Sequence, residues 1–289
     1  MTLIGVLLAL IAERSLGDWR ANEPSLLLKA LGVAQTTLRV PGFWNTPGAP
    51  VVVLALLTIA TGVGDALLER PLVHLFYGAA ILFLCLDPRP IASDIHKLIE
   101  AREKGDEATE RTLTRTLLRG PERDASRRSL IGALFIQAHE RQFGVLLWFI
   151  LAGPAGAVFY RVASRLHRFV HERAPESEAE RVAVTLHAAA AWIPARLTAL
   201  LFGLAGSLDQ AMHEWRRQHS AAGADWRDQT WAVLAEVSAA ALAIDEVVDG
   251  VAVPANLPEC LREVKAMQQR GLLILLAAFG LFSAGGLLH

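Results

Sequence analysis

The chain has 289 residues, of which 53% are hydrophobic and 20% are charged. Its 28 Lys and Arg residues nearly balance its 29 Asp and Glu residues, so the net charge is −1. This balance excludes a strongly basic nucleic-acid-binding protein. Two cysteines, Cys85 and Cys260, are too few for a disulfide framework or a structural zinc site, and the scattered histidines predict no metal site.

Apolar segments separated by charged ones explain a mean hydropathy of +0.36. A membrane span needs about 20 mostly apolar residues. The first apolar segment, residues 1–12, is short and is either a short span or an interfacial helix. The other apolar segments are residues 40–64, 71–86, 142–160, 182–208 and 271–288. No alternating strand pattern appears, so the sequence predicts an all-α, polytopic helical membrane protein with about five to six spans.

Two of these segments contain residues that interrupt a plain span. Gly153-Pro154 lies in the middle of the fourth segment, where such a pair kinks the helix, opens a packing seam or marks a re-entrant turn. Arg196 follows Pro194 in the fifth segment. A guanidinium within the membrane is costly unless it is paired, which makes Arg196 a candidate functional residue, unless it simply marks an interfacial end.

Basic residues predict which loops face the cytoplasm. The loops at 13–48, 87–141 and 209–270 hold 21 of the 28 Lys and Arg residues, against six at 65–70 and 161–181. Basic loops stay on the cytoplasmic side. The large loops are therefore expected in the cytoplasm, although the five arginines at 161–181 weaken the pattern unless a re-entrant turn places them there too.

The domain organisation follows from the same pattern. We expect a single membrane domain over residues 1–289, with helical cytoplasmic insertions at about 87–141 and 209–270. Apolar spacing and capping residues, including Ser93 or Asp94 and then Asp106, predict helices in these insertions. The expected helices cover residues 93–104, 107–118, 225–248 and 259–269, with a connection at 249–258.

Residues 137–141 place four polar side chains where the chain is about to enter the membrane. Gln137, Glu140 and Arg141 share one helical face, and His139 lies between them. This group could bind a cation, bind a phosphate or act as an acid–base pair, and the alternative is a helix-boundary ion-pair cluster. By contrast, Tyr160-Arg161 is interpreted as an anchor at the membrane interface. His167 and the arginines around it are interpreted as part of a solvated loop.

The combination of several short motifs resembles the CobD/CbiB membrane protein family over roughly residues 93–205. The resemblance rests on Gly105-Asp106, Arg123-Asp124, Glu140, Leu147-Trp148, 153–157, Tyr160-Arg161 and 193–198. It implies ATP-dependent amide formation between a cobyric acid and an aminopropanol phosphate. The chain departs from that family in three ways: it has no His-Pro pair, it has Arg141 where the synthases have Asn, and it has no acid at 186–192.

The first 14 residues, the hairpin of the second and third spans, and the run at 137–144 look more like AmpE, a degenerate relative of that family. This resemblance implies a non-enzymatic regulatory or accessory protein of the bacterial inner membrane, linked to cell-wall recycling and β-lactamase induction. The alternatives are a CobD/CbiB-like ATP-dependent amide synthetase and a transporter.

We expect a polar cleft that binds an anionic ligand such as a nucleotide, a lipid phosphate or a muropeptide. No catalytic residue is assigned and no cofactor is evident, although a nucleotide is one candidate. The other expected partners are the lipid bilayer and, as an option, further copies of the chain. The candidate ligand-binding residues are Arg123, Asp124, Gln137, His139, Glu140, Arg141, Tyr160, Arg161 and Arg196.

Overall fold

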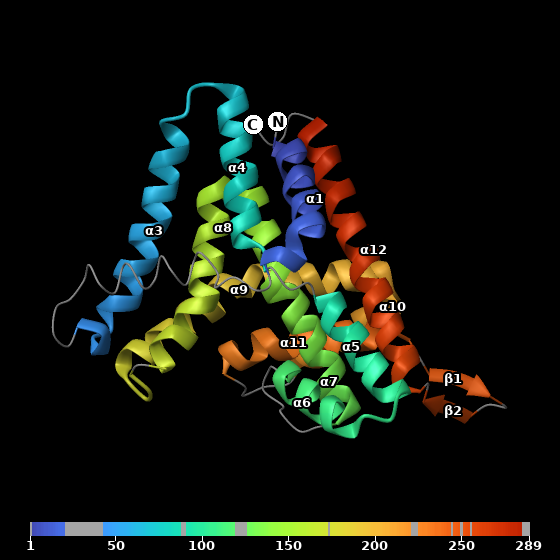
Figure 1. Ribbon diagram of the computed structural model, residues 1–289. Coiled ribbons are helices and arrows are strands. Elements are labelled where there is room, and N and C mark those ends of the chain that lie inside the picture. Colours follow the sequence, from blue (N-terminus) through green and yellow to red (C-terminus); the bar gives the residue numbers. More distant parts are fainter. Residues whose placement is uncertain are drawn as a thin grey trace. The chain divides into compact units, whose positions relative to one another are not determined.

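The computed structural model describes residues 2–20, 43–87, 91–118, 126–172, 174–220, 225–243, 245–248, 251–254 and 256–284 (Figure 1). The first elements are α1 (Thr2–Arg20), the 3₁₀ turn η1 (Phe43–Asn45), α3 (Gly48–Ala66), α4 (Pro71–Cys85), α5 (Ile91–Glu103), α6 (Glu107–Leu117) and α7 (Arg127–Ala138). They are followed by the π-helical segment η2 (His139–Phe143), α8 (Gly144–His171), α9 (Glu178–Ala205), α10 (Leu208–Ser220), α11 (Trp226–Ala241), β1 (Asp245–Val248), β2 (Val251–Pro254) and α12 (Leu257–Ala284).

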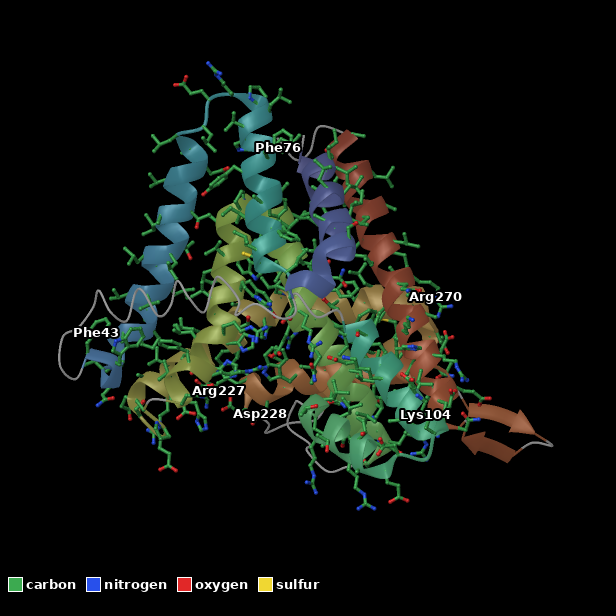
Figure 2. The ribbon with its side chains drawn as sticks, in the orientation of Figure 1. Phe43, Phe76, Lys104, Arg227, Asp228 and Arg270 are labelled. Atoms are coloured by element: carbon green, nitrogen blue, oxygen red, sulfur yellow. The ribbon has the colours of Figure 1, made fainter. Side chains whose placement is uncertain are left out.

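The predicted helical membrane fold is confirmed. Four helical segments of the described chain are long and apolar enough to cross a membrane: Gly48–Ala66, Arg127–His171, Glu178–Ala205 and Leu257–Ala284. Two further apolar helices are shorter, Leu3–Glu13 and Pro71–Cys85. Large apolar side chains lie exposed on these helices, such as Ile59 on α3. Phe76 on α4 is another, and it is labelled in Figure 2. Lipid accounts for this exposure, because a water-soluble protein rarely leaves so large an apolar surface open.

Sequence patterns located the helices of the insertions well. The helices expected at 93–104 and 107–118 are α5 and α6, and the Asp106 side chain caps α6 by accepting a hydrogen bond from the Thr109 backbone N–H. The helix expected at 225–248 instead ends at Ala241, and the antiparallel hairpin of β1 and β2 follows. This segment is rich in valine, a β-branched residue that favours strands over helices.

The chain divides into two compact units. Unit 1 comprises Met1–Arg89, Gln142–Pro194 and Phe279–His289, and unit 2 comprises Pro90–Arg141 and Ala195–Ala278. In unit 1, α4 packs against α1 and α8, and α3 packs against α8. In unit 2, α7 packs against α11, α10 packs against α11, and α5 packs against α6. Each unit therefore has its own core, and unit 2 contains most of both polar insertions.

The break expected at Gly153-Pro154 is confirmed, and the chain reverses its direction there; that this reversal is a re-entrant turn in the membrane stays a prediction. Ala152 and Gly153 leave the helical conformation, and Gly153 has φ +62°, which favours glycine. A straight helix would separate Gly144 from Tyr160 by about 24 Å. Instead, a Cβ atom at Gly144 would overlap the Tyr160 ring, and the centroids of the Trp148 and Phe159 rings are 4.9 Å apart. Helix α8 thus folds back into two adjacent arms within unit 1.

Candidate functional site

The polar run at 137–141 coincides with an irregular part of the backbone. Helix α7 is buried on every side from Ser129 to Ala138, as its nearly uniform apolar sequence predicts. At His139 the backbone becomes π-helical and remains so to Phe143. A π-helical turn changes the direction in which side chains point, and such turns are frequent at functional sites. No sequence pattern indicated this change of helix type.

Arg141 is held in a fixed position within unit 2. Its guanidinium donates to Asp94 Oδ2 at 2.6 Å and to the side-chain oxygen of Gln137. The Gln137 amide in turn donates to the backbone carbonyl of Leu117. Gln137 is buried, and the Asp94 and Arg141 side chains are about one-fifth exposed. These contacts connect α5, α6 and η2 and leave a guanidinium that reaches the surface with its orientation fixed.

His139 connects the π-helical segment to α9. Its Nδ1 atom lies 2.9 Å from Thr198 Oγ1, and both residues are fully buried. The indole ring of Trp231 lies edge-on to the imidazole, with ring centroids 6.3 Å apart. Arg196 lies two residues before Thr198 and is partly buried. The run at 137–141 and the Pro194–Thr198 run are therefore brought together, which sequence spacing alone did not indicate.

A second polar cluster lies in unit 1. Arg161 Nη2 donates to Asp87 Oδ2 at 2.9 Å, and Arg165 pairs with the same carboxylate oxygen. Arg161 is only 4% exposed, so the interpretation of this residue as an interfacial anchor is wrong. Arg161 pairs with Asp87 instead of reaching the interface, because a guanidinium taken out of water needs a carboxylate partner.

Aromatic side chains surround this second cluster. Tyr160 is fully buried and its ring lies 6.1 Å from that of His187. The His187 ring stacks on His167, with centroids 5.3 Å apart and planes within 9°. The expected solvated loop around His167 is therefore wrong, because the second arm of α8 carries this residue into the packed part of unit 1.

The candidate residues that the structure describes are distributed over both units. Gln137, His139, Glu140, Arg141 and Arg196 belong to unit 2, whereas Tyr160 and Arg161 belong to unit 1. Arg123 and Asp124 lie outside the described residues. The expected pairing of Glu140 with Arg196 stays a prediction.

Sequence reasoning missed three residues of these clusters: Asp87, Asp94 and Thr198. Asp94 was interpreted as a helix cap, but α5 begins at Ile91, so its carboxylate is free to pair with Arg141. Asp87 follows the apolar helix α4 directly. A carboxylate at the end of an apolar helix was the signal that could have identified it.

The chemistry available in unit 2 is that of one oriented cation and a neighbouring carboxyl group. Arg141 presents a planar guanidinium, which suits the oxygens of a phosphate or carboxylate. Glu140 is partly exposed beside it and could accept or donate a proton. Within the described residues, no group of three or more His, Cys, Asp or Glu side chains has the geometry to hold a metal ion.

Comparison with known proteins gives the family. The model of the family described as CobD/Cbib protein matches residues 6–251. The chain is 27% identical over 233 residues to the "Cobalamin biosynthesis protein CobD" of Chromobacterium violaceum, a match that covers 73% of this chain and 72% of that protein. The protein of the same name from Brucella suis is 26% identical over 268 residues, which is 80% of this chain and 79% of that protein. No solved structure matches the chain.

These matches correct the expectation of an AmpE-type regulator of β-lactamase induction. The four curated relatives that match are all named as cobalamin biosynthesis proteins. The shared pattern covers most of the chain, not only the motifs between residues 93 and 205. The short N-terminal and hairpin similarities to AmpE were misleading, because apolar helices resemble one another in composition whatever their function. The chain belongs to the CobD/Cbib protein family.

Proposed function

We propose that the chain acts in cobalamin biosynthesis as an ATP-dependent amide-forming synthetase of the inner membrane. The single observation that carries this proposal is the family match over residues 6–251. The proposed reaction joins the amine of an aminopropanol phosphate to a carboxylate of a cobyric acid. The large polar loops are proposed to face the cytoplasm, where ATP is available.

The reaction needs an activated carboxylate. A carboxylate oxygen of the corrinoid attacks a phosphorus atom of ATP, so that a P–O bond of ATP breaks and ADP (after phosphoryl transfer) or pyrophosphate (after nucleotidyl transfer) leaves. The amine nitrogen then attacks the activated carboxyl carbon. The new C–N bond forms while the C–O bond to the activating group breaks, and the amine gives up a proton. Both steps bring phosphate oxygens and carboxylates into one site, so the protein must supply oriented cations and a proton acceptor.

The geometry around the π-helical segment supports such a role. Arg141, fixed by Asp94 and Gln137, is suited to hold a phosphate of ATP or of the amine substrate. Glu140 beside it is proposed to accept the proton from the amine. Arg196 is proposed to contribute a second cation. Arg141 takes the place of an Asn in the resembled synthases, and its pairing with Asp94 gives it a defined orientation.

The test uses the purified full chain in a lipid nanodisc, with ATP, Mg²⁺, a cobyric acid and an aminopropanol phosphate. Mass spectrometry should detect the amide product, and its appearance should require ATP. We expect Glu140→Gln to lower kcat by about 10²-fold or more, the usual contribution of a general base. Arg141→Gln should raise the KM of a phosphate-bearing substrate more than it changes kcat.

Arg115→Gln is the matched control, because Arg115 is an exposed residue of α6 away from these contacts. It should leave both constants unchanged. Absence of product from folded protein with all substrates present would refute the proposed synthetase activity. Product formation that Glu140→Gln leaves unaffected would refute the role assigned to Glu140.

A further inference from the structure

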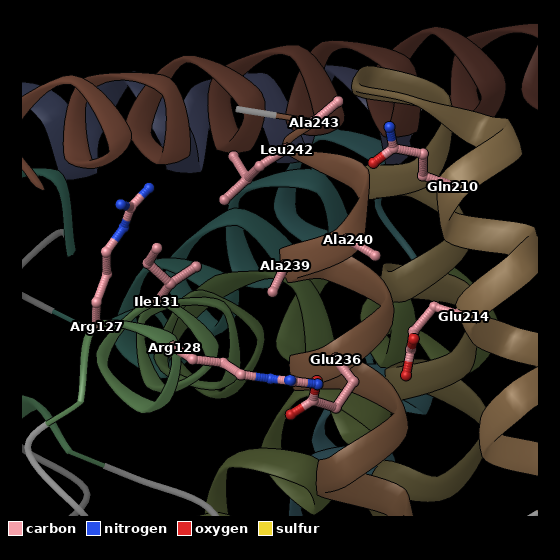
Figure 3. Close-up of a pocket in the computed structure, with 10 residues that line it drawn as sticks. All are labelled: Arg127, Arg128, Ile131, Gln210, Glu214, Glu236, Ala239, Ala240, Leu242 and Ala243. Atoms are coloured by element: carbon pink, nitrogen blue, oxygen red, sulfur yellow. The ribbon is translucent and has the colours of Figure 1, made fainter. Parts of the chain in front are cut away.

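A groove in unit 2 lies away from the residues assigned to the proposed reaction. It is formed between α7, α10 and α11 and has a volume of about 410 Å³ (Figure 3). Its lining combines apolar side chains, among them Ile131, Ala239 and Leu242, with the charged side chains of two arginines and two glutamates. A cavity of this size and mixed lining suits a small molecule that has both an apolar and a charged part.

Both carboxylates of the groove already have a cation as partner. Arg128 pairs with Glu236, and Glu214 accepts a hydrogen bond from Arg217 at 2.8 Å. Gln218 donates to the same Glu214 oxygen at 2.7 Å. The groove therefore offers little to a cationic ligand, because each carboxylate would have to exchange an existing charge-assisted hydrogen bond for a new one.

Arg127 is the lining cation that has no carboxylate partner among the described residues. Its Nη2 atom lies 2.7 Å from the sulfur of Cys260, and that sulfur is its hydrogen-bond partner in this part of the chain. A thiol sulfur is a weak acceptor and does not balance the charge of a guanidinium. Because a guanidinium carries five N–H donors, Arg127 keeps donors for an oxyanion.

The position of Arg127 in α7 adds to the positive potential. Helix α7 begins with Arg127 and Arg128, and its first turn contains no acidic residue. A helix N-terminus carries a partial positive charge, so two arginines there are unfavourable unless negative charge lies nearby. Glu236 provides that charge for Arg128. One further negative charge, placed in the groove, would do the same for Arg127.

We propose that this groove binds a small aliphatic monocarboxylate, with its carboxylate at Arg127 and its hydrocarbon part over Ile131 and Leu242. In Figure 3 the Arg127 side chain lies toward these two apolar residues, on the side of the groove away from Glu214. The bidentate fit of a carboxylate to a planar guanidinium supplies the polar contact. Burial of the hydrocarbon part against the apolar lining supplies the rest of the binding free energy.

The charge of the groove favours a carboxylate over a phosphate. Arg127 supplies one positive charge, and a carboxylate supplies one negative charge. A phosphate monoester carries about −1.5 to −2 at neutral pH, so it would bring excess negative charge near Glu214 and Glu236. The proposal goes beyond the amide-forming activity and does not rest on it, since neither Glu140 nor Arg141 lines the groove.

The test compares butyrate with butanol, butylamine and butyl phosphate, which have similar aliphatic parts and different head groups. Binding to the full chain in phosphatidylcholine nanodiscs is measured by ligand-observed NMR titration, and empty nanodiscs give the background from lipid. We expect butyrate to bind about tenfold or more tightly than butanol and butylamine, the effect of one charge-assisted hydrogen bond. Butyl phosphate should bind more weakly than butyrate. Acetate should bind about tenfold more weakly than butyrate, because it lacks two methylene groups.

Two variants locate the site. Arg127→Gln should remove the preference for butyrate over butanol, because the glutamine side chain carries no charge. Ala239→Leu should abolish binding of butyrate by filling the groove. The matched control is Arg216→Gln, since Arg216 is an exposed arginine of α10 that does not line the groove. This control should leave every affinity unchanged.

Three results would overturn the proposal. They are equal binding of butyrate and butanol to the unaltered chain, a preference for butyrate that persists in Arg127→Gln, and binding of butyl phosphate as tight as that of butyrate. Should Arg127→Gln fail to fold, Arg127→Lys keeps the charge and should retain the preference, and butyrate binding that survives Ala239→Leu would then refute the site. These titrations contain no ATP and no corrinoid, so their failure and the failure of the amide-forming activity are separate results.

Discussion

Arg161 is a buried guanidinium that shares the Asp87 carboxylate with Arg165. The two arginine side chains differ in burial, since that of Arg161 is 5% exposed and that of Arg165 is 26% exposed. A buried ion pair that loses one partner costs about 3–5 kcal/mol, whereas an exposed pair is worth about 0–1 kcal/mol. Because both arginines carry the same charge and pair with the same carboxylate, a difference in stability between their alanine variants reports the difference in burial.

We predict that Arg161→Ala lowers the free energy of unfolding by up to about 3 kcal/mol, because Arg165 still compensates Asp87. Arg165→Ala is the matched control and should cost about 1 kcal/mol or less. Melting temperatures of the two variants in the same detergent give the comparison. Equal losses of unfolding free energy in the two variants would show that the burial of Arg161 adds nothing to its ion pair with Asp87.

Glu214 links stability to pH. Its lowered pKa means that the carboxylate favours the folded state above the usual carboxyl pKa of 4.5. This contribution is lost as the pH falls through the lower folded-state pKa. We predict that the unaltered chain is more stable than Glu214→Gln near neutral pH, and that the difference shrinks below about pH 4.5. Thermal unfolding of both proteins across this range is the measurement, and a difference that grows on acidification would contradict the prediction.

At the scale of the elements, α8 is two arms joined by a turn. Its sequence is apolar enough to read as one continuous helix, but Gly153 at φ +62° reverses the chain. Glycines allow the arms to approach closely: Gly144 faces the Tyr160 ring, and Gly156 faces the backbone of Trp148. Close approach through small residues is how helices pack where lipid replaces water and no hydrophobic driving force remains.

We predict that Gly144→Ala destabilises the chain by about 1–3 kcal/mol, because the new methyl group would overlap the buried Tyr160 ring. Gly280→Ala is the matched control. Its Cβ would lie 3.5 Å from the nearest atom, a side-chain carbon of Leu3, so the substitution should be tolerated. Thermal unfolding in detergent separates the two. A tolerated Gly144→Ala would mean that the arms of α8 are not in contact.

For the whole molecule, the chain reversal at Gly153 changes the expected placement of the basic residues. Asp87 at the end of α4 pairs with Arg161 and Arg165, so the second arm of α8 returns to the side of unit 1 where α4 ends. We therefore expect the arginines at 161–181 to face the cytoplasm together with the large loops. On this expectation 26 of the 28 Lys and Arg residues are cytoplasmic, Arg70 is periplasmic and Arg196 lies within a span. The distribution agrees better with cytoplasmic basic loops than the expectation of a fourth span ending at residue 160.

We predict that reporters fused after residues 105, 176 and 225 are cytoplasmic and that a reporter after residue 69 is periplasmic. The reason is the tendency of basic loops to remain in the cytoplasm. Alkaline phosphatase and fluorescent-protein fusions give opposite signals on the two sides. A periplasmic signal at 176 with a cytoplasmic signal at 105 would restore a conventional fourth span.

Much of the fold followed from local sequence. The apolar segments, the Asp106 cap and the break at Gly153-Pro154 could all be identified, because helix periodicity, capping and glycine conformation depend on neighbouring residues. The run at 137–141 was also visible as polar residues next to an apolar segment. The AmpE-like function was wrong because apolar similarity says little about chemistry, and the comparison with relatives over most of the chain was needed to correct it.

The sequence by itself determined that this protein is a helical membrane protein with polar helical insertions, since hydropathy and periodicity act within single helices. Only the tertiary structure decided which polar residues meet. Asp94 pairs with Arg141 across 47 residues, Asp87 with Arg161 across 74, and His139 with Thr198 across 59. Such pairs are selected by the cost of burying an unpaired polar group, and that cost depends on which surfaces pack together, which no local pattern specifies.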